Sequence, residues 1–358
     1  MRNILRLFLS GVFLTGALLA PSQASIFNKK LLVNGAGATF PYPLYSRWFS
    51  EYQKLHPDVA FNYQSIGSGG GIRQLLDETI DFGASDAPMS DEQLKKAKGP
   101  IIHVPGTMGA VVITYNFDGL KQPLKLTGPL IADIFLGKIN KWNDPRITDL
   151  NPELKTVLGG TSPDILVVHR ADGSGTTSIF SEFLSKSSDE WKAKVGKGTA
   201  LRWPAGIGGK GNEGVTSFIK QIPGAIGYVE LVFAKTLKLP VASVENPMHE
   251  FVEPSPMTVT KAAEGALSHI PDDFRYSLTN VPASQAYPIS AFTYILVYDK
   301  MEKGAKRDAL FHFLRWGLDI GQGMSEKLNY APLPQPLVTR ILKRLDQSDA
   351  ALSRGPTP

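Results

Sequence analysis

Residues 59–76, VAFNYQSIGSGGGIRQLL, contain a predicted β-strand, a glycine turn and the start of a helix in direct succession. Apolar and polar side chains alternate over 59–66, which is typical of a strand with one buried face. After the glycine turn at 67–71, apolar side chains recur at helical spacing at Ile72, Leu75, Leu76 and Ile80. A strand that runs through a turn into a helix is the repeating unit of an open α/β sheet. The stretch therefore predicts an α/β fold.

The same succession occurs twice more. GAGATF (35–40) joins a short strand to a helix, and ADGSGTT (171–177) joins a buried strand at 165–168 to a helix over 178–184. The other predicted strands are 82–85, 111–115, 225–229 and 292–298, and the other predicted helices are 130–136, 215–221, 309–318 and 337–345. Residues 239–284 are rich in Pro, Ser and Glu and have only weak periodicity, so their order is not predicted.

The first residues predict a secretory signal peptide over 1–24. A basic start at 1–6 precedes an apolar run at 7–20, and small residues follow up to Ala24. Because that run is too short to cross a bilayer, we expect cleavage near Ala24 rather than an uncleaved anchor. The chain contains no cysteine, hence neither disulfides nor a cysteine for lipid attachment. A periplasmic protein with about two domains fits this length and composition.

The charge and the histidines argue against a nucleic-acid partner and against a metal site. The formal net charge is +5, and removal of Arg2 and Arg6 with the signal peptide leaves a mildly basic chain. Basic runs interleaved with aromatics are absent from the glycine turns, so we expect no nucleic-acid partner. The six histidines are scattered, and His249-Glu250 does not continue into the H-E-x-x-H pattern. We therefore expect no metal site and no metallophosphatase.

A secreted hydrolase is the alternative from another class of protein. Ser174, Asp172 and His169 supply the residue types of a catalytic triad within one short segment. Such proximity in sequence disfavours the geometry of a triad, and DGSGT lacks the G-x-S-x-G elbow. We therefore expect no catalytic residues and no enzyme activity.

The three turns GAGATF, GSGGG and ADGSGTT share one physical property. Each precedes a helix, whose first N–H groups lack backbone partners and carry a partial positive charge. An anion can accept several of these N–H bonds where side chains are small. Because strand ends of open α/β sheets bring such turns to one edge, the three together could enclose a small tetrahedral oxyanion. Each turn alone is better explained as a plain capped turn, and only the presence of three in one chain favours an anion site. GAGATF does not match the dinucleotide fingerprint, and GSGGGIR does not match the Walker fingerprint.

Two charged residues refine the expected ligand. The Arg170 guanidinium can grip an oxyanion through two parallel hydrogen bonds, and Asp172 is close enough to pair with it. Asp86 would repel a fully deprotonated anion but can accept a hydrogen bond from a protonated one, as phosphate is and sulfate is not. The alternatives are an ordinary ion pair at Arg170, a capping role for Asp86 and sulfate or another oxyanion as the ligand.

Six segments, taken in order, resemble the periplasmic phosphate-binding proteins of bacterial phosphate ABC transporters. They are NGAGATFPYPLYSRW, YQSIGSGGGIRQL, DFGASDAPMSDEQL, HRADGSGTTSIF, WPAGIGGKGNEGV and PGAIGYVE. The resemblance covers nearly the whole mature chain. It implies the two-domain type II periplasmic-binding-protein fold, in which two open α/β lobes close on one inorganic phosphate without a cofactor. His169 and Gly69 depart from the residues that are frequent in this family, and we expect neither to change the ligand.

The resemblance also implies a ligand set, a domain division and partners. Asp172 would hold Arg170 in place. The residues implied to bind phosphate are Thr39, Phe40 through its backbone N–H, Ser68, Asp86, Arg170, Ser174, Gly175 and Thr176. The chain would cross between lobes near Gly106-Thr107 and near 284–287, which gives domain I as 25–107 with 284–358 and domain II as 108–283. The expected partners are two membrane permease subunits and an ATPase subunit, with this chain a monomer in the periplasm.

Overall fold

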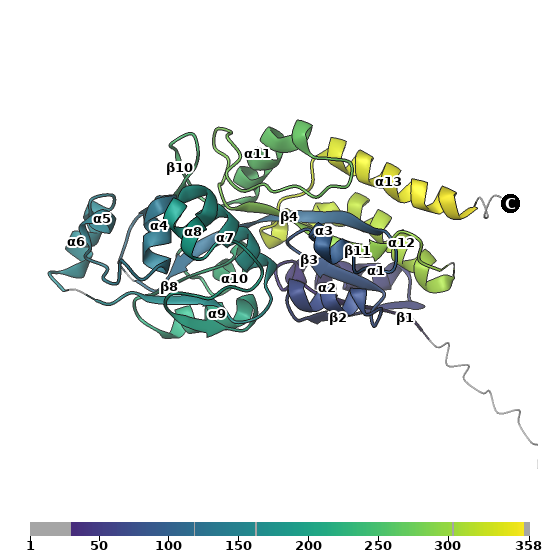
Figure 1. Cartoon of the computed structure of the whole chain (residues 1–358), viewed down its shortest axis with the longest axis horizontal. Helices are drawn as coiled ribbons and strands as arrows, with labels where there is room; N and C mark the ends of the chain where they lie inside the picture. The colour runs from purple at the N-terminus through teal and green to yellow at the C-terminus, as the bar shows by residue number, and fades with distance from the viewer. Residues whose placement is uncertain (1–29, 118, 162, 303, 354–358) are drawn as a thin grey trace, which may run out of the picture.

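A mixed eight-stranded sheet with the strand order β2-β1-β3-β11-β4-β8-β6-β7 runs through the whole molecule. The computed structural model describes residues 30–353 except 118, 162 and 303, so the predicted signal peptide at 1–24 lies outside the described residues. Helices pack around the sheet in two α/β lobes, with β4 running from one lobe into the other (Figure 1). The predicted α/β class is confirmed.

The first lobe is built on three parallel strands, each followed by a small-residue turn. The strands are β1 (Leu31–Gly37), β2 (Val59–Ser65) and β3 (Phe82–Ser85). The principal helices of this lobe are α1 (Tyr42–Leu55), α2 (Ser68–Leu76) and α12 (Ala305–Asp319). The α1 side chains at helical spacing, Leu44, Trp48 and Tyr52 among them, are buried. The short helix α3 (Asp91–Leu94) follows β3.

The second lobe repeats the arrangement with a second set of parallel strands. They are β6 (Leu166–Arg170), β7 (Ile207–Gly209) and β8 (Ala225–Glu230). Its helices are α4 (Gly128–Phe135), α5 (Pro145–Thr148), α6 (Pro152–Leu158), α7 (Gly175–Ser187), α8 (Asp189–Lys194), α9 (Gly211–Gln221) and α10 (Leu231–Thr236). Helices α7 and α9 begin earlier than their apolar periodicity predicts, because the glycine-rich turns before them form the first helical turn.

The long strand β4 (Ile101–Tyr115) connects the lobes. It pairs antiparallel with β11 (Ser290–Tyr298) as far as Ala110, and from Val111 onward it pairs antiparallel with β8. The sequence predicts only 111–115 as strand, because Pro105, Gly106 and Gly109 interrupt the earlier part of the run. These two antiparallel strands at the centre make the sheet mixed.

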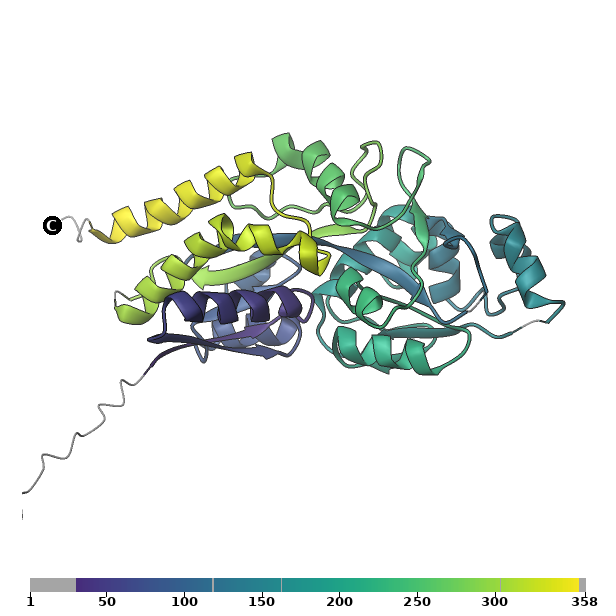
Figure 2. The ribbon, with the colours of Figure 1, turned by 180° about the vertical axis from the view of Figure 1, so that it is seen from behind.

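The segment 239–284, whose order the sequence does not predict, is largely folded onto the rest of the molecule. It contains β9 (Ser243–Glu245), β10 (Phe251–Val252), α11 (Pro256–Ala266) and the short helix η1 (Leu267–His269), and β9 also pairs with β5 (Lys125–Leu126). Both ribbon views place α11 on the same edge as α13 (Gln335–Ser353) (Figures 1 and 2). Arg340 of α13 donates to the carbonyl oxygen of Ile270 at 2.8 Å, which ties this segment to the C-terminal helix.

Candidate functional site

The three turns GAGATF (35–40), GSGGG (67–71) and ADGSGTT (171–177) face one another from the two lobes. Thr39 and Phe40 lie between β1 and α1, Ser68 begins α2, and Asp86 follows β3, all on the first lobe. On the second lobe, Arg170 ends β6 and residues 174–176 open α7. All eight predicted ligand residues are buried. The carboxyl ends of strands from both lobes therefore meet at one place, which is where open α/β sheets bind ligands.

Direct hydrogen bonds join the second and third turns across the lobes. The Gly175 N–H donates to Ser68 Oγ at 3.1 Å, and the Gly69 N–H donates to the Gly173 carbonyl oxygen at 2.9 Å. A Cβ atom on Gly175 would lie 2.4 Å from Ser68 Oγ and 2.7 Å from the Cβ of Asp86. Only glycine at position 175 permits this close approach.

Arg170 is held rigidly in the buried interior. Its side chain is 1% exposed, and it donates from Nε to Asp172 Oδ1 at 2.8 Å and from Nη2 to Asp172 Oδ2 at 2.5 Å. Asp172 Oδ1 also accepts from the Gly211 N–H at 3.0 Å. Burial by itself would raise the pKa of Asp172, but the hydrogen bonds and charge of Arg170 outweigh it and lower this pKa below its usual value. The carboxylate therefore stays charged, and the remaining guanidinium nitrogen, Nη1, reaches Thr176 Oγ1 at 3.3 Å.

Asp86 is a buried acid among donors. Its Oδ1 accepts from Thr293 Oγ1 at 2.9 Å and its Oδ2 accepts from Ser68 Oγ at 3.4 Å. Burial raises the pKa of Asp86 to about 7, although Thr293, Arg170 and Ser68 act in the opposite direction. A carboxyl with this pKa can share a proton with a ligand near neutral pH. The alternative that Asp86 caps the next helix is wrong, because Ser90 caps α3 in a capping box.

Further donors surround these two charged groups. Ser174 caps α7, and its Oγ accepts from the Thr177 N–H at 3.0 Å, which leaves the Ser174 O–H free to donate. Within the part of the chain that the structure describes, the N–H groups of Phe40 and Thr176 have no protein acceptor. The arrangement thus combines one fixed guanidinium, several N–H and O–H donors and the carboxyl acceptor of Asp86. Such a set matches a small tetrahedral oxyanion that carries a proton.

The structure adds residues that the sequence does not predict. Asn212, the second residue of α9, contacts both Thr39 and Thr176, and Thr293 binds Asp86. The Tyr228 hydroxyl accepts from the Arg170 N–H at 3.1 Å. Asn212 lies in GKGNEG, a fourth glycine-rich turn, which could have indicated it. Thr293 is hidden in the apolar run of β11, where no local pattern distinguishes it.

The triad residue types are not assembled for catalysis. The His169 ring stacks on Trp203 with centroids 4.7 Å apart, and its Nδ1 pairs with the backbone oxygen of Arg170, while Ser174 serves as the cap of α7. No group of three or more metal-ligating side chains occurs among the described residues. The hydrogen bonds of Ser174 therefore match a donor in a binding site rather than a nucleophile with an adjacent base.

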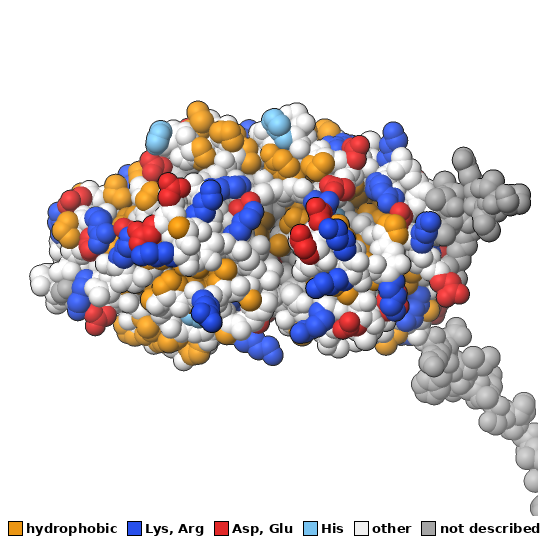
Figure 3. All heavy atoms as spheres, in the orientation of Figure 1, with side chains coloured by type: hydrophobic (Ala, Val, Ile, Leu, Met, Phe, Trp, Pro, Cys, Tyr) orange, Lys and Arg blue, Asp and Glu red, His pale blue; other side chains and the backbone are white. Residues whose placement is uncertain are grey.

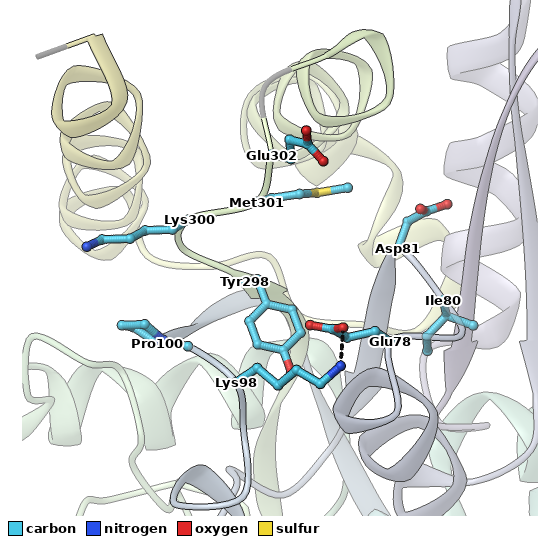
Figure 4. A pocket seen from close by; sticks show the side chains of 10 residues that line it. Glu78, Ile80, Asp81, Lys98, Pro100, Tyr298, Lys300, Met301 and Glu302 are labelled. Atoms are coloured by element: carbon cyan, nitrogen blue, oxygen red, sulfur yellow. Dashed lines mark hydrogen bonds and ion pairs between the residues drawn. The ribbon is translucent and has the colours of Figure 1, made fainter. Parts of the chain in front are cut away.

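A surface hollow of about 570 Å³ elsewhere on the first lobe does not belong to this site (Figure 4). It lies where β11 ends and is lined by Tyr298, Lys98, Glu78 and neighbouring residues. Lys98 pairs with Glu78 at 2.5 Å, so its charge is already compensated. None of the predicted ligand residues lines this hollow.

Comparisons with known proteins show which family this chain belongs to. The chain matches the PBP superfamily domain over residues 20–319. It is 45% identical over 316 residues to the phosphate-binding protein PstS of Xylella fastidiosa (strain 9a5c), an alignment that covers 87% of this chain and 84% of the relative.

Two solved structures align over most of both chains. A human phosphate-binding apolipoprotein aligns with a TM-score of 0.68 at 21% identity, covering 86% of this chain and 93% of that one. PfluDING, a high-affinity periplasmic phosphate-binding protein solved with bound phosphate, aligns with a TM-score of 0.66 at 21% identity, covering 87% and 93%. These alignments confirm the predicted two-lobed fold. The chain therefore belongs to the PBP superfamily and, within it, to the PstS family of phosphate-binding proteins.

Proposed function

We infer that this protein binds inorganic phosphate as the substrate-binding component of a bacterial phosphate ABC transporter. The observation that carries this inference is a fixed guanidinium and a buried acid, Arg170 and Asp86, placed together among N–H and O–H donors. The names of the PstS relatives and the phosphate bound in PfluDING support the same ligand. The guanidinium compensates part of the charge of the anion, the N–H and O–H groups donate hydrogen bonds to it, and the acid accepts the proton that phosphate keeps at neutral pH.

The ligand set that we propose is the one predicted from the resemblance. On the first lobe, Asp86 accepts the phosphate proton. On the second lobe, Arg170, positioned by Asp172, grips two oxygens. The remaining donors are Thr39, the Phe40 N–H, Ser68, Ser174, Gly175 and Thr176. Burial of all eight supports this assignment. So do the hydrogen bonds that join five of them, in the pairs Ser68–Asp86, Arg170–Thr176 and Gly175–Ser68.

We further propose that phosphate closes the two lobes onto each other. Domain I would comprise 25–107 and 284–358, and domain II would comprise 108–283. The change of strand partner along β4, after Ala110, lies close to the first proposed crossing and supports a hinge there. Because the proposed ligand residues are divided between the two lobes, an anion that binds residues of both lobes favours the conformation in which the lobes are closed.

The last part of the proposal is that the protein delivers phosphate to a membrane permease. The mature chain, cleaved near Ala24, would act as a monomer in the periplasm and pass phosphate to two permease subunits driven by an ATPase subunit. Among the described residues, no helix has the length and apolar character needed to cross a membrane. On the face shown in Figure 3, acidic and basic side chains are interspersed over both lobes, which agrees with a partner other than nucleic acid.

Titration calorimetry of the purified mature protein with phosphate, arsenate and sulfate tests the function. We expect phosphate and arsenate to bind far more tightly than sulfate, because sulfate offers no proton to Asp86. Sulfate binding as tight as phosphate binding would overturn the proposed ligand. A phosphoesterase assay with and without divalent metal tests the hydrolase alternative, and we expect no phosphate release above the background rate.

A further inference from the structure

We propose that Asn212 is a positioning residue that fixes the hydroxyl groups of Thr39 and Thr176 as hydrogen-bond donors toward the bound anion. The proposal rests on the phosphate site proposed above and adds a residue that this site requires. Asn212 is fully buried at the start of α9 on the second lobe, whereas Thr39 precedes α1 on the first. Helices α9 and α1 lie in different lobes in Figure 1.

The side-chain amide of Asn212 joins three separate elements. Its Nδ2 lies 2.7 Å from Thr39 Oγ1 and 3.3 Å from Thr176 Oγ1, and its Oδ1 accepts from the Glu230 N–H at 3.0 Å. The orientation of the amide follows from the last contact, because a backbone N–H can only donate. The Asn212 oxygen must therefore face Glu230, and its NH₂ group must face the two threonines.

The two threonine hydroxyls are saturated as acceptors. Thr39 Oγ1 accepts from the Asn212 N–H at 3.3 Å as well as from Asn212 Nδ2. Thr176 Oγ1 accepts from Asn212 Nδ2 and from Arg170 Nη1, both at 3.3 Å. A hydroxyl has two acceptor lone pairs and one O–H, so each threonine keeps only the capacity to donate.

The Ser68 hydroxyl is also saturated as an acceptor, although Asn212 does not contact it. Its Oγ accepts from the N–H groups of Asp86 at 3.2 Å and Gly175 at 3.1 Å. All three hydroxyls are thus limited to donation. The Ser68 O–H donates to Asp86 Oδ2 at 3.4 Å, whereas the O–H groups of Thr39 and Thr176 have no protein acceptor among the described residues. An oxyanion presents lone pairs to such hydroxyls, whereas a freely rotating hydroxyl would spend part of its time with its own lone pairs facing the anion. Asn212 removes that unfavourable orientation before the ligand arrives.

Double-mutant cycles measured by phosphate calorimetry test the proposal. We expect Asn212→Ala, Thr39→Val and Thr176→Val each to weaken phosphate binding about 10- to 100-fold, since each removes or misdirects a hydrogen bond to a charged ligand. If Asn212 acts through the hydroxyls, Asn212→Ala should cost clearly less in either valine background than in the wild type. The exposed Asn62→Ala is the matched control and should bind like the wild type.

Each outcome decides the proposal. Equal losses from Asn212→Ala in the wild type and in both valine backgrounds would overturn it. Coupling with Thr39 alone would also overturn it, because that result makes Asn212 only a contact between lobes. Should Asn212→Ala fail to fold by circular dichroism, Asn212→Leu, which is similar in size and removes the donor without adding a charge, allows the same cycles. Absence of phosphate binding by the wild type would reject the proposed function. If the wild type binds phosphate but the affinity losses of the single variants simply add in the double variants, only the Asn212 proposal is rejected.

Discussion

Arg170 and Asp172 form two parallel hydrogen bonds, from Nε to Oδ1 at 2.8 Å and from Nη2 to Oδ2 at 2.5 Å. Arg170 is buried and Asp172 is partly buried, and the two residues are only two positions apart. Such a fork fixes the plane of the guanidinium before any ligand binds. The acid beside the base therefore positions the base, and we propose that the acid that distinguishes ligands is Asp86 on the opposite lobe.

The first prediction concerns the charge of Arg170. Arg170→Ala should weaken phosphate binding at least about 100-fold, because it removes a charge-assisted pair of hydrogen bonds and leaves Asp172 as an uncompensated charge. Arg170→Lys should recover only part of this loss, since an ammonium group cannot form the fork. Calorimetry measures both variants. Arg146→Ala, at a half-exposed site on the same lobe, is the control, and wild-type affinity in Arg170→Ala would contradict the proposed site.

A second prediction addresses selectivity. Asp86→Asn should change phosphate affinity little but reduce the discrimination between phosphate and sulfate, because the amide can donate to sulfate where the carboxylate cannot. Competition calorimetry with both anions gives the ratio. The exposed Asp91→Asn serves as the control. If Asp86→Asn keeps the wild-type ratio, Asp86 does not select the ligand.

Gly175 supplies a steric test of closure. A Cβ at this position would come within 2.4 Å of Ser68 Oγ and 2.7 Å of Asp86 Cβ, so Gly175→Ala should hold the lobes apart. We expect phosphate affinity to fall more than about 10-fold, since the ligand then engages one lobe well and the other poorly. Small-angle scattering with phosphate should show a more open shape than the wild type. Gly323→Ala, where an added Cβ meets nothing within 4 Å, is the matched control, and full affinity in Gly175→Ala would argue against this closure.

The burial of Glu230 predicts that the stability of the fold depends on pH. This residue ends β8 beside β4, is fully buried and has one carboxyl oxygen without a partner among the described residues. Burial raises its pKa well above the usual value. An acid whose pKa is raised by folding stabilises the fold below its unfolded pKa, and this stability is lost as the pH rises through the folded pKa. Between the unfolded pKa and the folded pKa, the unfolding free energy falls by roughly 1.4 kcal/mol for each pH unit.

The unfolding free energy of Glu230→Gln should therefore fall less steeply from acidic to mildly alkaline pH than that of the wild type. Denaturant unfolding without phosphate measures both slopes. Asp86, with a pKa raised to about 7, contributes a fall of the same sign that remains in this variant. The exposed Glu264→Gln should leave the wild-type slope unchanged. Identical slopes in Glu230→Gln and the wild type would show that Glu230 is not neutral in the folded protein.

Local features of this protein follow from the sequence by itself. The strand–turn–helix units at 31–55, 59–76 and 165–187 depend on side-chain periodicity and on glycine at defined points of each turn, which are properties of neighbouring residues. The pairing of Arg170 with Asp172 is local for the same reason. The three turns, Arg170 and Asp86 therefore become candidates for one oxyanion site before any tertiary contact is known.

The tertiary structure decided what depends on residues distant in sequence. Thr293 reaches Asp86 from 207 positions away and Asn212 reaches Thr39 from 173 positions away. No periodicity encodes such contacts, because they arise from the order of strands in the sheet and from the approach of the two lobes. The raised pKa values of Asp86 and Glu230 likewise depend on burial by the whole fold. Burial and hydrogen-bond saturation are collective properties, and they turn a set of plausible donors into a site with one defined acceptor.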